Sequence, residues 1–123
     1  LRKLDEWNEA RRSLANSYNT ALADVVSVPL ENEHEFHVYQ TYMIKAHRRD
    51  ELQSFLRTQG IESIIHYPIP IHLQPAAKIL NHKEGSFPIA EKLSQEILSL
   101  PLYPGLSQSD QQFVIEKIHE FYK

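Results

Sequence analysis

The chain has 123 residues, of which 41% are hydrophobic and 24% charged, and its formal net charge is −3. This length fits one domain with a modest core, and the composition favours a soluble globular protein over a disordered one. The near balance of acids and bases gives no electrostatic sign of nucleic-acid binding. The absence of cysteine excludes disulfide frameworks and thiolate metal sites. No apolar run approaches the roughly 18 to 20 residues that span a bilayer, so we expect neither a nucleic-acid nor a membrane partner.

The first half of the chain predicts a helix, a strand and a second helix. Apolar residues recur at steps of three, four and seven over residues 1–23, which predicts a helix. No Ser, Thr, Asp or Asn precedes Leu1, so we expect this helix to start upstream of the first residue. Alternating β-branched and aromatic residues predict a strand over 38–46. Helical spacing returns over residues 48–60, where Gly60 supplies a left-handed ending with Ile61 in contact with Leu56.

The second half predicts shorter elements broken by prolines. Residues 62–67 have the composition of a strand, which Pro68 ends because it has no backbone N–H. A short helical piece follows at 76–80, then a helix at 87–98 and an apolar segment at 98–104 that could form a third strand.

The last helix is predicted over residues 106–123, where Ser107 and Asp110 resemble a capping box. Helices and strands thus alternate along the chain without an internal repeat or a linker. Three short strands make a small sheet that needs helices over one face. We therefore predict an α/β fold with a mixed or antiparallel three-stranded sheet covered by helices.

Seven histidines raise the hypothesis of a metal site, because His66 and His72 flank a proline-rich turn and His34 lies close to His37. Zinc requires a third and usually a fourth ligand of defined geometry, and neither pair belongs to a recognised metal-site pattern. Loop histidines that bond to backbone or solvent are the simpler interpretation. We predict no metal site.

The residues usual in self-contained catalytic sites are also missing. There is no glycine-flanked serine, and the three glycines are too dispersed for a phosphate-binding loop. Glu91 and Glu96 are spaced poorly for a carboxylate pair, which favours a solvated helix face. Arg48 and Arg49 precede two acidic residues, which favours surface ion pairs. We therefore assign no catalytic residue within the chain.

The segment IIHYPIPIHLQP, residues 64–75, is the best local candidate for function. A strand end that turns on prolines can hold an imidazole and a phenol toward a cleft with little entropy left to lose. A rigid structural turn, in which His66 and Tyr67 satisfy backbone groups, is the competing interpretation.

These segments resemble the DegT and StrS family of pyridoxal-phosphate-dependent nucleotide-sugar aminotransferases, which share the fold of aspartate aminotransferase. The resemblance rests on LDEWNEARRSLANSYNTAL, on VYQTYMIKAHRRDELQSFLRTQGIESIIHYPIPIHLQP, on FPIAEKLSQEILSLPLYPGLS and on the last helix. Their order and spacing match the C-terminal part of the family and cover nearly the whole chain.

The resemblance implies that residues 1–123 form the C-terminal (small) domain of a fold-type-I aminotransferase, beginning partway through the connector helix. The large domain, which in the family carries the Schiff-base lysine and the pyridoxal phosphate site, is then absent. We accordingly expect no cofactor on this chain alone, no activity of the chain alone, and an exposed apolar patch that promotes self-association.

For the full-length enzyme, the resemblance implies a cytoplasmic homodimer that transfers an amino group from glutamate to a nucleotide-linked keto sugar in deoxyamino sugar biosynthesis. The sequence HYPIPIHLQP resembles most those family members that act on a 3-keto sugar of a thymidine nucleotide. His66 and Tyr67 would contact this substrate. The residues implied to shape the loop are Pro68, Pro70, His72 and Gln74.

Two alternatives stay open at this point. The chain could be a free-standing α/β interaction or regulatory module, or part of a catalytically silent aminotransferase-like sensor. The sequence upstream of Leu1 distinguishes these possibilities. A lysine in an aminotransferase-like context there would favour the enzyme. The absence of such a segment would favour the module, and a large domain in which that lysine is replaced would favour the sensor.

Overall fold

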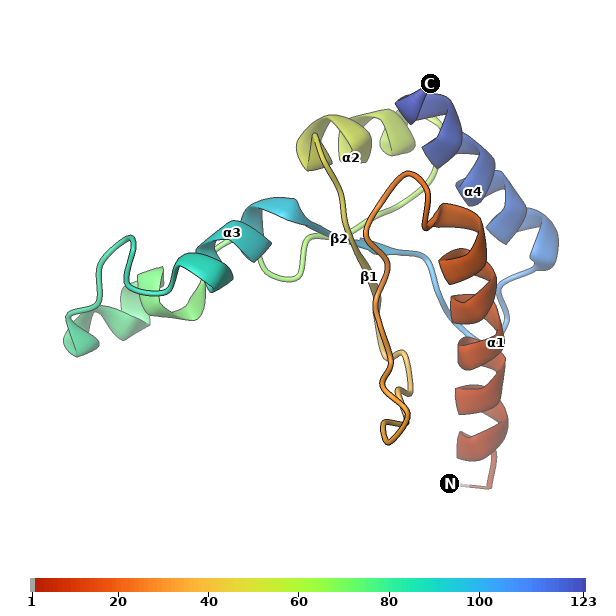
Figure 1. Ribbon diagram of the computed structural model, residues 1–123, viewed down its shortest axis with the longest axis horizontal. Helices are drawn as coiled ribbons and strands as arrows, with labels where there is room; N and C mark the ends of the chain where they lie inside the picture. The colour runs from red at the N-terminus through yellow and green to blue at the C-terminus, as the bar shows by residue number, and fades with distance from the viewer. Residues whose placement is uncertain (1) are drawn as a thin grey trace.

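The structure, a computed structural model, describes residues 2–123 and confirms the α/β class, with helices around a small sheet (Figure 1). The described residues form four α-helices, two strands and two short 3₁₀ helices. Their bounds are α1 (Leu4–Leu22), β1 (Tyr42–Lys45), α2 (Arg49–Thr58), η1 (Ile71–Leu73), η2 (Pro75–Leu80), α3 (Pro88–Glu96), β2 (Ile97–Leu100) and α4 (Gln108–Tyr122).

Helix α1 begins later than its periodicity predicts. It starts at Leu4 after a turn at residues 2 and 3, and Lys3 at its N-cap makes no side-chain capping hydrogen bond. The expected upstream start depends on Leu1, which lies outside the described residues.

The sheet has two strands rather than the three that the sequence predicts. β1 and β2 run antiparallel, with Tyr42 opposite Leu100 and Lys45 opposite Ile97. The segment predicted as a further strand, residues 62–67, contributes only one bridge beside β2. It leaves the sheet because the chain turns toward Pro68, which cannot donate to a ladder.

Two isolated bridges extend this sheet by one residue pair on each side. Ile64 exchanges hydrogen bonds with Ser99 of β2, at N···O distances of 3.1 and 2.8 Å. Ser27 pairs in the same way with Lys45 of β1. The Ile64 bridge fixes where residues 66 and 67 leave the sheet.

Helix α3 ends at Glu96, two residues before its predicted end, because buried polar contacts favour a strand from Ile97 onward. The guanidinium of Arg49 donates to the carbonyls of Ser94 and Ile97, at 3.0 and 2.9 Å. The amide of Ala46 donates to the carbonyl of Glu96 at 2.8 Å. These bonds satisfy carbonyls that the end of a helix leaves without partners. Arg49 forms the predicted ion pair, from Nε to the exposed Asp50 at 2.7 Å, but its guanidinium is buried rather than on the surface.

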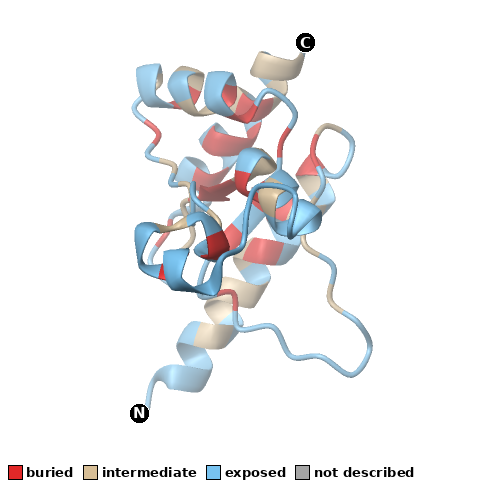
Figure 2. Cartoon of the chain, turned by 90° about the vertical axis from the view of Figure 1, so that its left-hand side faces the viewer, coloured by how far each residue is buried: buried red, intermediate tan, exposed pale blue. Residues whose placement is uncertain are grey.

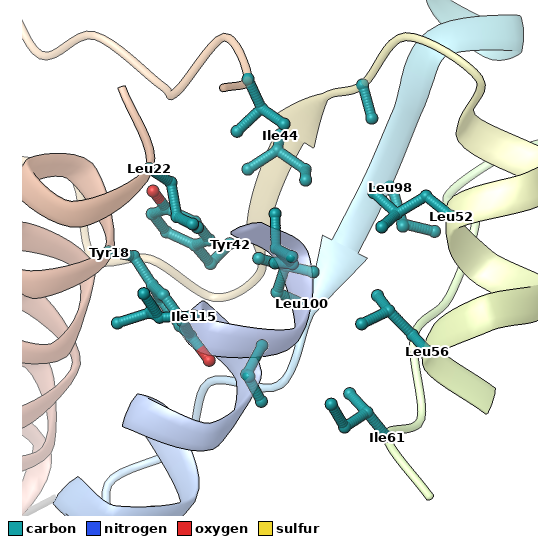
Figure 3. Close-up of a cluster of buried hydrophobic side chains, with 14 of the residues drawn as sticks. Tyr18, Leu22, Tyr42, Ile44, Leu52, Leu56, Ile61, Leu98, Leu100 and Ile115 are labelled. Atoms are coloured by element: carbon teal, nitrogen blue, oxygen red, sulfur yellow. The ribbon is translucent and has the colours of Figure 1, made fainter. Parts of the chain in front are cut away.

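The hydrophobic core lies between one face of the sheet and helices α1, α2 and α4 (Figure 3). In β1, Tyr42 and Ile44 are buried while Met43 and Lys45 are exposed, which is the alternation of a strand with one covered face. The labelled core residues from the other elements are Tyr18, Leu22, Leu52, Leu56, Ile61, Leu98, Leu100 and Ile115.

Two stacked tyrosines carry hydroxyl groups into this core and satisfy them there. The rings of Tyr18 and Tyr42 stack with centroids 4.9 Å apart. The Tyr18 hydroxyl donates to the carbonyl of Pro101 at 3.0 Å, and that of Tyr42 to the side chain of Asn19 at 2.7 Å. Burial raises the pKa of both phenols, so they remain neutral hydrogen-bond donors.

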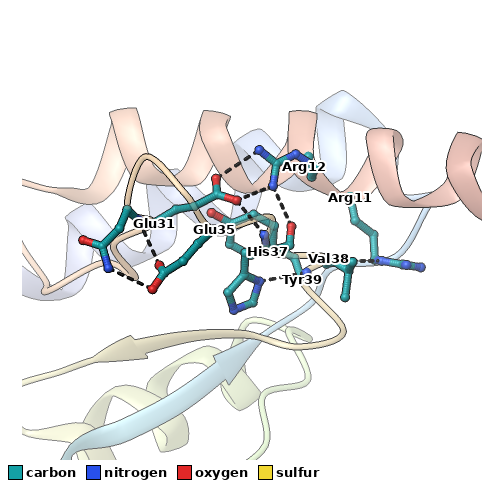
Figure 4. Close-up of polar contacts among 8 residues, drawn as sticks. Arg11, Arg12, Glu31, Glu35, His37, Val38 and Tyr39 are labelled. Carbon is teal, nitrogen blue, oxygen red and sulfur yellow. Dashed lines mark hydrogen bonds and ion pairs between the residues drawn. The ribbon is translucent and has the colours of Figure 1, made fainter.

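The connection between α1 and β1 is held on α1 by two arginines (Figure 4). Arg12 forms an ion pair with Glu31 at 2.5 Å and donates to the carbonyl of His37 at 2.7 Å. Arg11 donates to the carbonyl of Val38 at 2.9 Å. β1 begins only at Tyr42, after Tyr39 turns the chain with a φ of 46°.

Both predicted helix ends are confirmed. The Ser107 hydroxyl accepts from the amide of Asp110 at 3.0 Å, as in a capping box. Gly60 has a φ of 76°, and the amide of Ile61 donates to the carbonyl of Leu56 at 2.9 Å, as the predicted ending of α2 requires.

The chain has two unequal parts. We call residues 66–96 the arm and the rest of the described chain the body. The arm, with η1, η2 and α3, projects away from the body and is mostly exposed (Figures 1 and 2). Among the described helices, none has the length and apolar character that crossing a membrane requires.

Candidate functional site

The candidate site begins where the chain passes from the body into the arm. The bridge between Ile64 and Ser99 brings His66 beside β2, and Nδ1 of His66 lies 2.9 Å from Oγ of Ser99. His66 is half-buried. The imidazole is therefore held on the body, one residue before the chain becomes exposed.

Tyr67 is the exposed member of the pair. Its side chain is 71% exposed, and its ring meets that of His66 edge to face, with centroids 5.6 Å apart. The peptide bond between the two residues is cis. A phenol placed this way offers both an apolar ring and a hydroxyl to a ligand.

Beside Tyr67 lies an open groove of about 500 Å³, formed within the arm. Its lining is almost entirely apolar and aromatic, and it runs between the 66–73 segment and α3. Residues that line it include Tyr67, Ile69, His72, Leu80, Phe87 and Leu93. An apolar groove with a few polar groups at its edge is the usual form of a small-molecule site.

The residues predicted to shape the loop make contacts within the arm. Pro70 precedes η1, and its carbonyl accepts from the amide of Leu73 at 3.0 Å. The Gln74 side chain donates to the carbonyl of Ile69 at 3.2 Å. Pro68, at the start of the turn, is exposed. Gln74 and the prolines thus lie in one tightly turned segment.

His72 is buried, and its partner is a glutamate that the sequence led us to place on a solvated helix face. Nε2 of His72 lies 2.9 Å from Oε1 of Glu91, and the His72 ring packs against Phe87 with centroids 4.8 Å apart. The Glu91 carboxylate also accepts from the amides of Gly85 and Phe87, at 2.8 and 3.1 Å. The prediction that Glu91 lies on a solvated helix face is therefore wrong.

Glu91 joins three segments of the arm through this one carboxylate. The amide of Gly85 is the main cause that lowers the pKa of Glu91, and the amide of Phe87 and the imidazole of His72 add to it. The carboxylate is held charged by donors from the 82–87 loop and from η1. The sequence signal that could have revealed it is the position of Glu91 in the first turn of a helix, where a carboxylate can bond to free amides.

Three of the four histidines considered as metal ligands bond to other groups. His66 bonds to Ser99 and His72 to Glu91, while Nδ1 of His37 accepts from the amide of Tyr39 at 2.9 Å. Within residues 2–123, no group of three or more His, Asp or Glu side chains is arranged to hold a metal ion.

A second hollow, of about 560 Å³, lies on the body between the end of α2 and the start of α4. Glu62 and Asp110 are its acidic residues, and Ile64 and Ser99 also line it. None of the substrate-binding residues implied by the sequence lines it, so we centre the candidate site on the arm.

Comparison with known proteins identifies the family. Residues 1–119 match the DegT/DnrJ/EryC1/StrS aminotransferase family. The chain belongs to this family. The resemblance found in the sequence is thus confirmed, and it covers nearly all of the chain.

Relatives within the DegT/DnrJ/EryC1/StrS family include proteins with regulatory and with enzymatic names. The chain is 48% identical to "Pleiotropic regulatory protein" of Geobacillus stearothermophilus, covering 98% of this chain and 33% of that protein. It is 37% identical to "dTDP-3-amino-3,4,6-trideoxy-alpha-D-glucose transaminase" of Streptomyces venezuelae, covering 98% of this chain and 32% of that enzyme. The chain thus spans about a third of the length of the curated relatives it matches.

The fold agrees with solved structures of the family. The S. venezuelae DesV structure, determined in complex with a ketimine intermediate, superposes with a TM-score of 0.96 at 36% identity, over 100% of this chain and 34% of DesV. The arrangement of body and arm is therefore that of a family member.

Proposed function

We propose that the chain is the small domain of a pyridoxal-phosphate-dependent aminotransferase that transfers an amino group from glutamate to a nucleotide-linked keto sugar. The full-length enzyme would be a cytoplasmic homodimer in deoxyamino sugar biosynthesis. Family membership and the transaminase relative from S. venezuelae support the reaction class. That relative's name specifies a dTDP-linked 3-amino sugar, which agrees with a 3-keto sugar of a thymidine nucleotide as the acceptor.

One structural observation carries the proposal for this chain. His66 and Tyr67 lie side by side at the root of the arm, with Tyr67 exposed beside an apolar groove. In this position the imidazole and the phenol can bind and orient a polar ligand, while the groove excludes water from its apolar part. We assign both residues to substrate binding and neither to proton transfer.

We infer that residues 2–123 do not hold pyridoxal phosphate, and the positions of the lysines support this. Of the seven lysines, six are exposed, and Lys117 forms an ion pair with Glu120 at 2.7 Å. None lines the groove beside Tyr67. The cofactor supplies the electron sink for transamination, and we infer that the large domain of the full-length enzyme holds it. The contribution of residues 2–123 is to bind and position the sugar nucleotide.

The exposed apolar side chains of the arm support a missing intramolecular partner. Ile71, Ile79 and Ile89 are 80%, 82% and 76% exposed. All three belong to the arm, and a concentration of exposed apolar side chains on one part of a protein usually marks an interface. We infer that the large domain of the same polypeptide covers part of this surface.

The substitution His66→Ala in the full-length enzyme tests the binding role. We expect KM for the nucleotide sugar to rise about tenfold, with a smaller change in kcat, because a hydrogen bond to a charged ligand is lost. Amino sugar formation from glutamate, followed by mass spectrometry, provides the measurement. His47→Ala is the matched control, since His47 is exposed on the body and makes no side-chain hydrogen bond among residues 2–123. An unchanged KM for His66→Ala would show that the site lies elsewhere.

The chain alone gives a second test. Titration with pyridoxal phosphate should produce no specific lysine adduct that borohydride traps. A single trapped lysine would overturn the assignment of the cofactor site to the large domain.

A regulatory role is the alternative, because the G. stearothermophilus relative at 48% identity carries a regulatory name. A full-length protein without transaminase activity on any nucleotide-linked keto sugar, and without a lysine that binds pyridoxal phosphate, would favour the sensor. An absent large domain would favour the free-standing module.

A further inference from the structure

His66 uses only one of its two ring nitrogens within the protein. Nδ1 lies 2.9 Å from Oγ of Ser99, and the ring makes no other hydrogen bond or ion pair among residues 2–123. The neutral imidazole carries its proton on either Nδ1 or Nε2, and the partner of one nitrogen decides the role of the other. The partner of Nδ1 therefore determines what Nε2 offers to a ligand.

Ser99 is buried although its side chain points away from the hydrophobic core. In β2 it alternates with Leu98 and Leu100, which belong to the core, so its side chain points to the opposite face of the sheet. Its cross-strand neighbour Met43 is 38% exposed on that face. Ser99 is nevertheless only 6% exposed, and the segment that pairs with it through Ile64 brings the His66 ring to its hydroxyl.

The burial of Ser99 decides the direction of the hydrogen bond. Nδ1 of His66 is the one side-chain partner of this hydroxyl among the described residues. If Nδ1 carried the proton and donated it, the O–H of this serine, which is only 6% exposed, would have no acceptor among the described residues. An unsatisfied buried donor is costly, so the arrangement in which the hydroxyl donates to Nδ1 is favoured.

We propose that Ser99 is a positioning residue for His66. Its hydroxyl donates to Nδ1, places the ring proton on Nε2 and fixes the ring orientation, so that His66 presents an N–H donor to an acceptor oxygen of the ligand. The identity of that ligand, a nucleotide-linked sugar with its phosphate and carbonyl oxygens, rests on the proposed function. The tautomer of His66 and its dependence on Ser99 are independent of the proposed function.

Long-range ¹H–¹⁵N spectra of the labelled chain test the tautomer directly, at about pH 8, where an ordinary imidazole is neutral. We expect His66 to show the Nε2–H form almost exclusively. His34, which is exposed and makes no hydrogen bond within residues 2–123, gives the reference mixture of tautomers in the same spectrum. A wild-type His66 in the Nδ1–H form, or in the mixture shown by His34, would overturn the proposal whatever the variants do.

Variants then test the role of the hydroxyl. Ser99→Ala should move His66 toward the His34 mixture, while Ser99→Thr, which keeps a hydroxyl, should retain the wild-type pattern. Ser63→Ala is the matched control, because Ser63 precedes His66 by three residues and its hydroxyl has no hydrogen-bond partner. Dispersed amide spectra confirm folding. No change in Ser99→Ala, or an equal change in Ser63→Ala, would contradict the assignment.

The full-length enzyme tests the contact with the ligand separately. Ser99→Ala should raise KM for the nucleotide sugar about fivefold with kcat nearly unchanged, the effect of one neutral hydrogen bond. It should add nothing in a His66→Ala background, because Ser99 acts through His66. A shifted tautomer with an unchanged KM would overturn the ligand contact. Complete lack of transamination would instead contradict the proposed function and leave the tautomer result standing.

Discussion

The body and the arm are stabilised by different interactions. The body has a continuous core in which Tyr18, Ile44 and Leu56 are fully buried. No residue of the arm belongs to that core, and Ala77 is its one buried apolar residue among those described. The arm is instead organised by polar contacts around the Glu91 carboxylate. The body should therefore resist perturbation as a unit, while the arm should open locally.

The body supplies most of the stability, whereas the arm carries most of the candidate site. The body gains its stability from apolar burial, and it anchors His66 through Ser99. The arm carries the exposed Tyr67 and the apolar groove but buries little surface of its own. Regions that bind ligands or partners commonly come from the less stable part of a protein. In the proposed full-length enzyme, contact with the large domain or with substrate would complete the stability of the arm.

Replacing one isoleucine in the body and one in the arm with alanine should give the largest difference in the free energy of unfolding. Ile44→Ala removes a fully buried side chain from the core of the body and should lower the free energy of unfolding by about 2–5 kcal/mol. Ile79→Ala removes an arm side chain that is 82% exposed and should change it by less than about 0.5 kcal/mol. Urea denaturation of both variants provides the measurement. Equal losses would mean that the arm contributes to the same core as the body.

The junction of body and arm depends on Arg49. Arg49→Met keeps the aliphatic stem but removes the donors to the carbonyls of Ser94 and Ile97, and should destabilise the chain by about 1.5–3 kcal/mol. Arg48→Met is the control, because Arg48 is exposed, pairs with Glu51 on the surface and lies 4.8 Å from the centroid of the Phe121 ring, so its loss should cost less than about 1 kcal/mol. Similar losses in thermal or urea unfolding would show that the buried guanidinium has no special role.

The body was largely predictable from the sequence because its signals are local. Apolar periodicity located α1, α2 and α4, and Gly60 and Ser107 marked helix ends that the structure confirms. The errors concern partners far apart in sequence. The carbonyls that Arg49 binds lie more than forty residues away in the chain, and no local pattern reports such a contact.

The arm was predictable in composition but not in geometry. The prolines and the HYP sequence at residues 66–68 indicated a rigid turn, while the substrate-binding role implied for His66 and Tyr67 stays a prediction. The hydrogen bond to Ser99 and the contacts of Glu91 depend on tertiary placement. Glu91 looked like any helix-surface glutamate because its backbone partners, Gly85 and Phe87, have no side-chain signature.

The smallest expected effect is a local, pH-dependent opening of the arm. The folded-state pKa of Glu91 lies below the ordinary value of about 4.3, so its charged form stabilises the arm above that value. This contribution is lost as pH falls through the ordinary value toward the folded-state pKa. Protection of the Gly85 and Phe87 amides against hydrogen exchange should therefore fall severalfold below about pH 4, while the core of the body remains protected.

Glu91→Gln should produce the same loss of protection at neutral pH, because an amide has one acceptor oxygen and no charge for the donors from Gly85, Phe87 and His72. Glu84→Gln is the matched control, since Glu84 is an exposed neighbour without a side-chain hydrogen bond among residues 2–123. Protection factors from amide exchange NMR measure both variants, corrected for the intrinsic rate at each pH. Protection that is insensitive both to pH and to Glu91→Gln would mean that packing of Phe87 against His72, and not the carboxylate, holds the arm together.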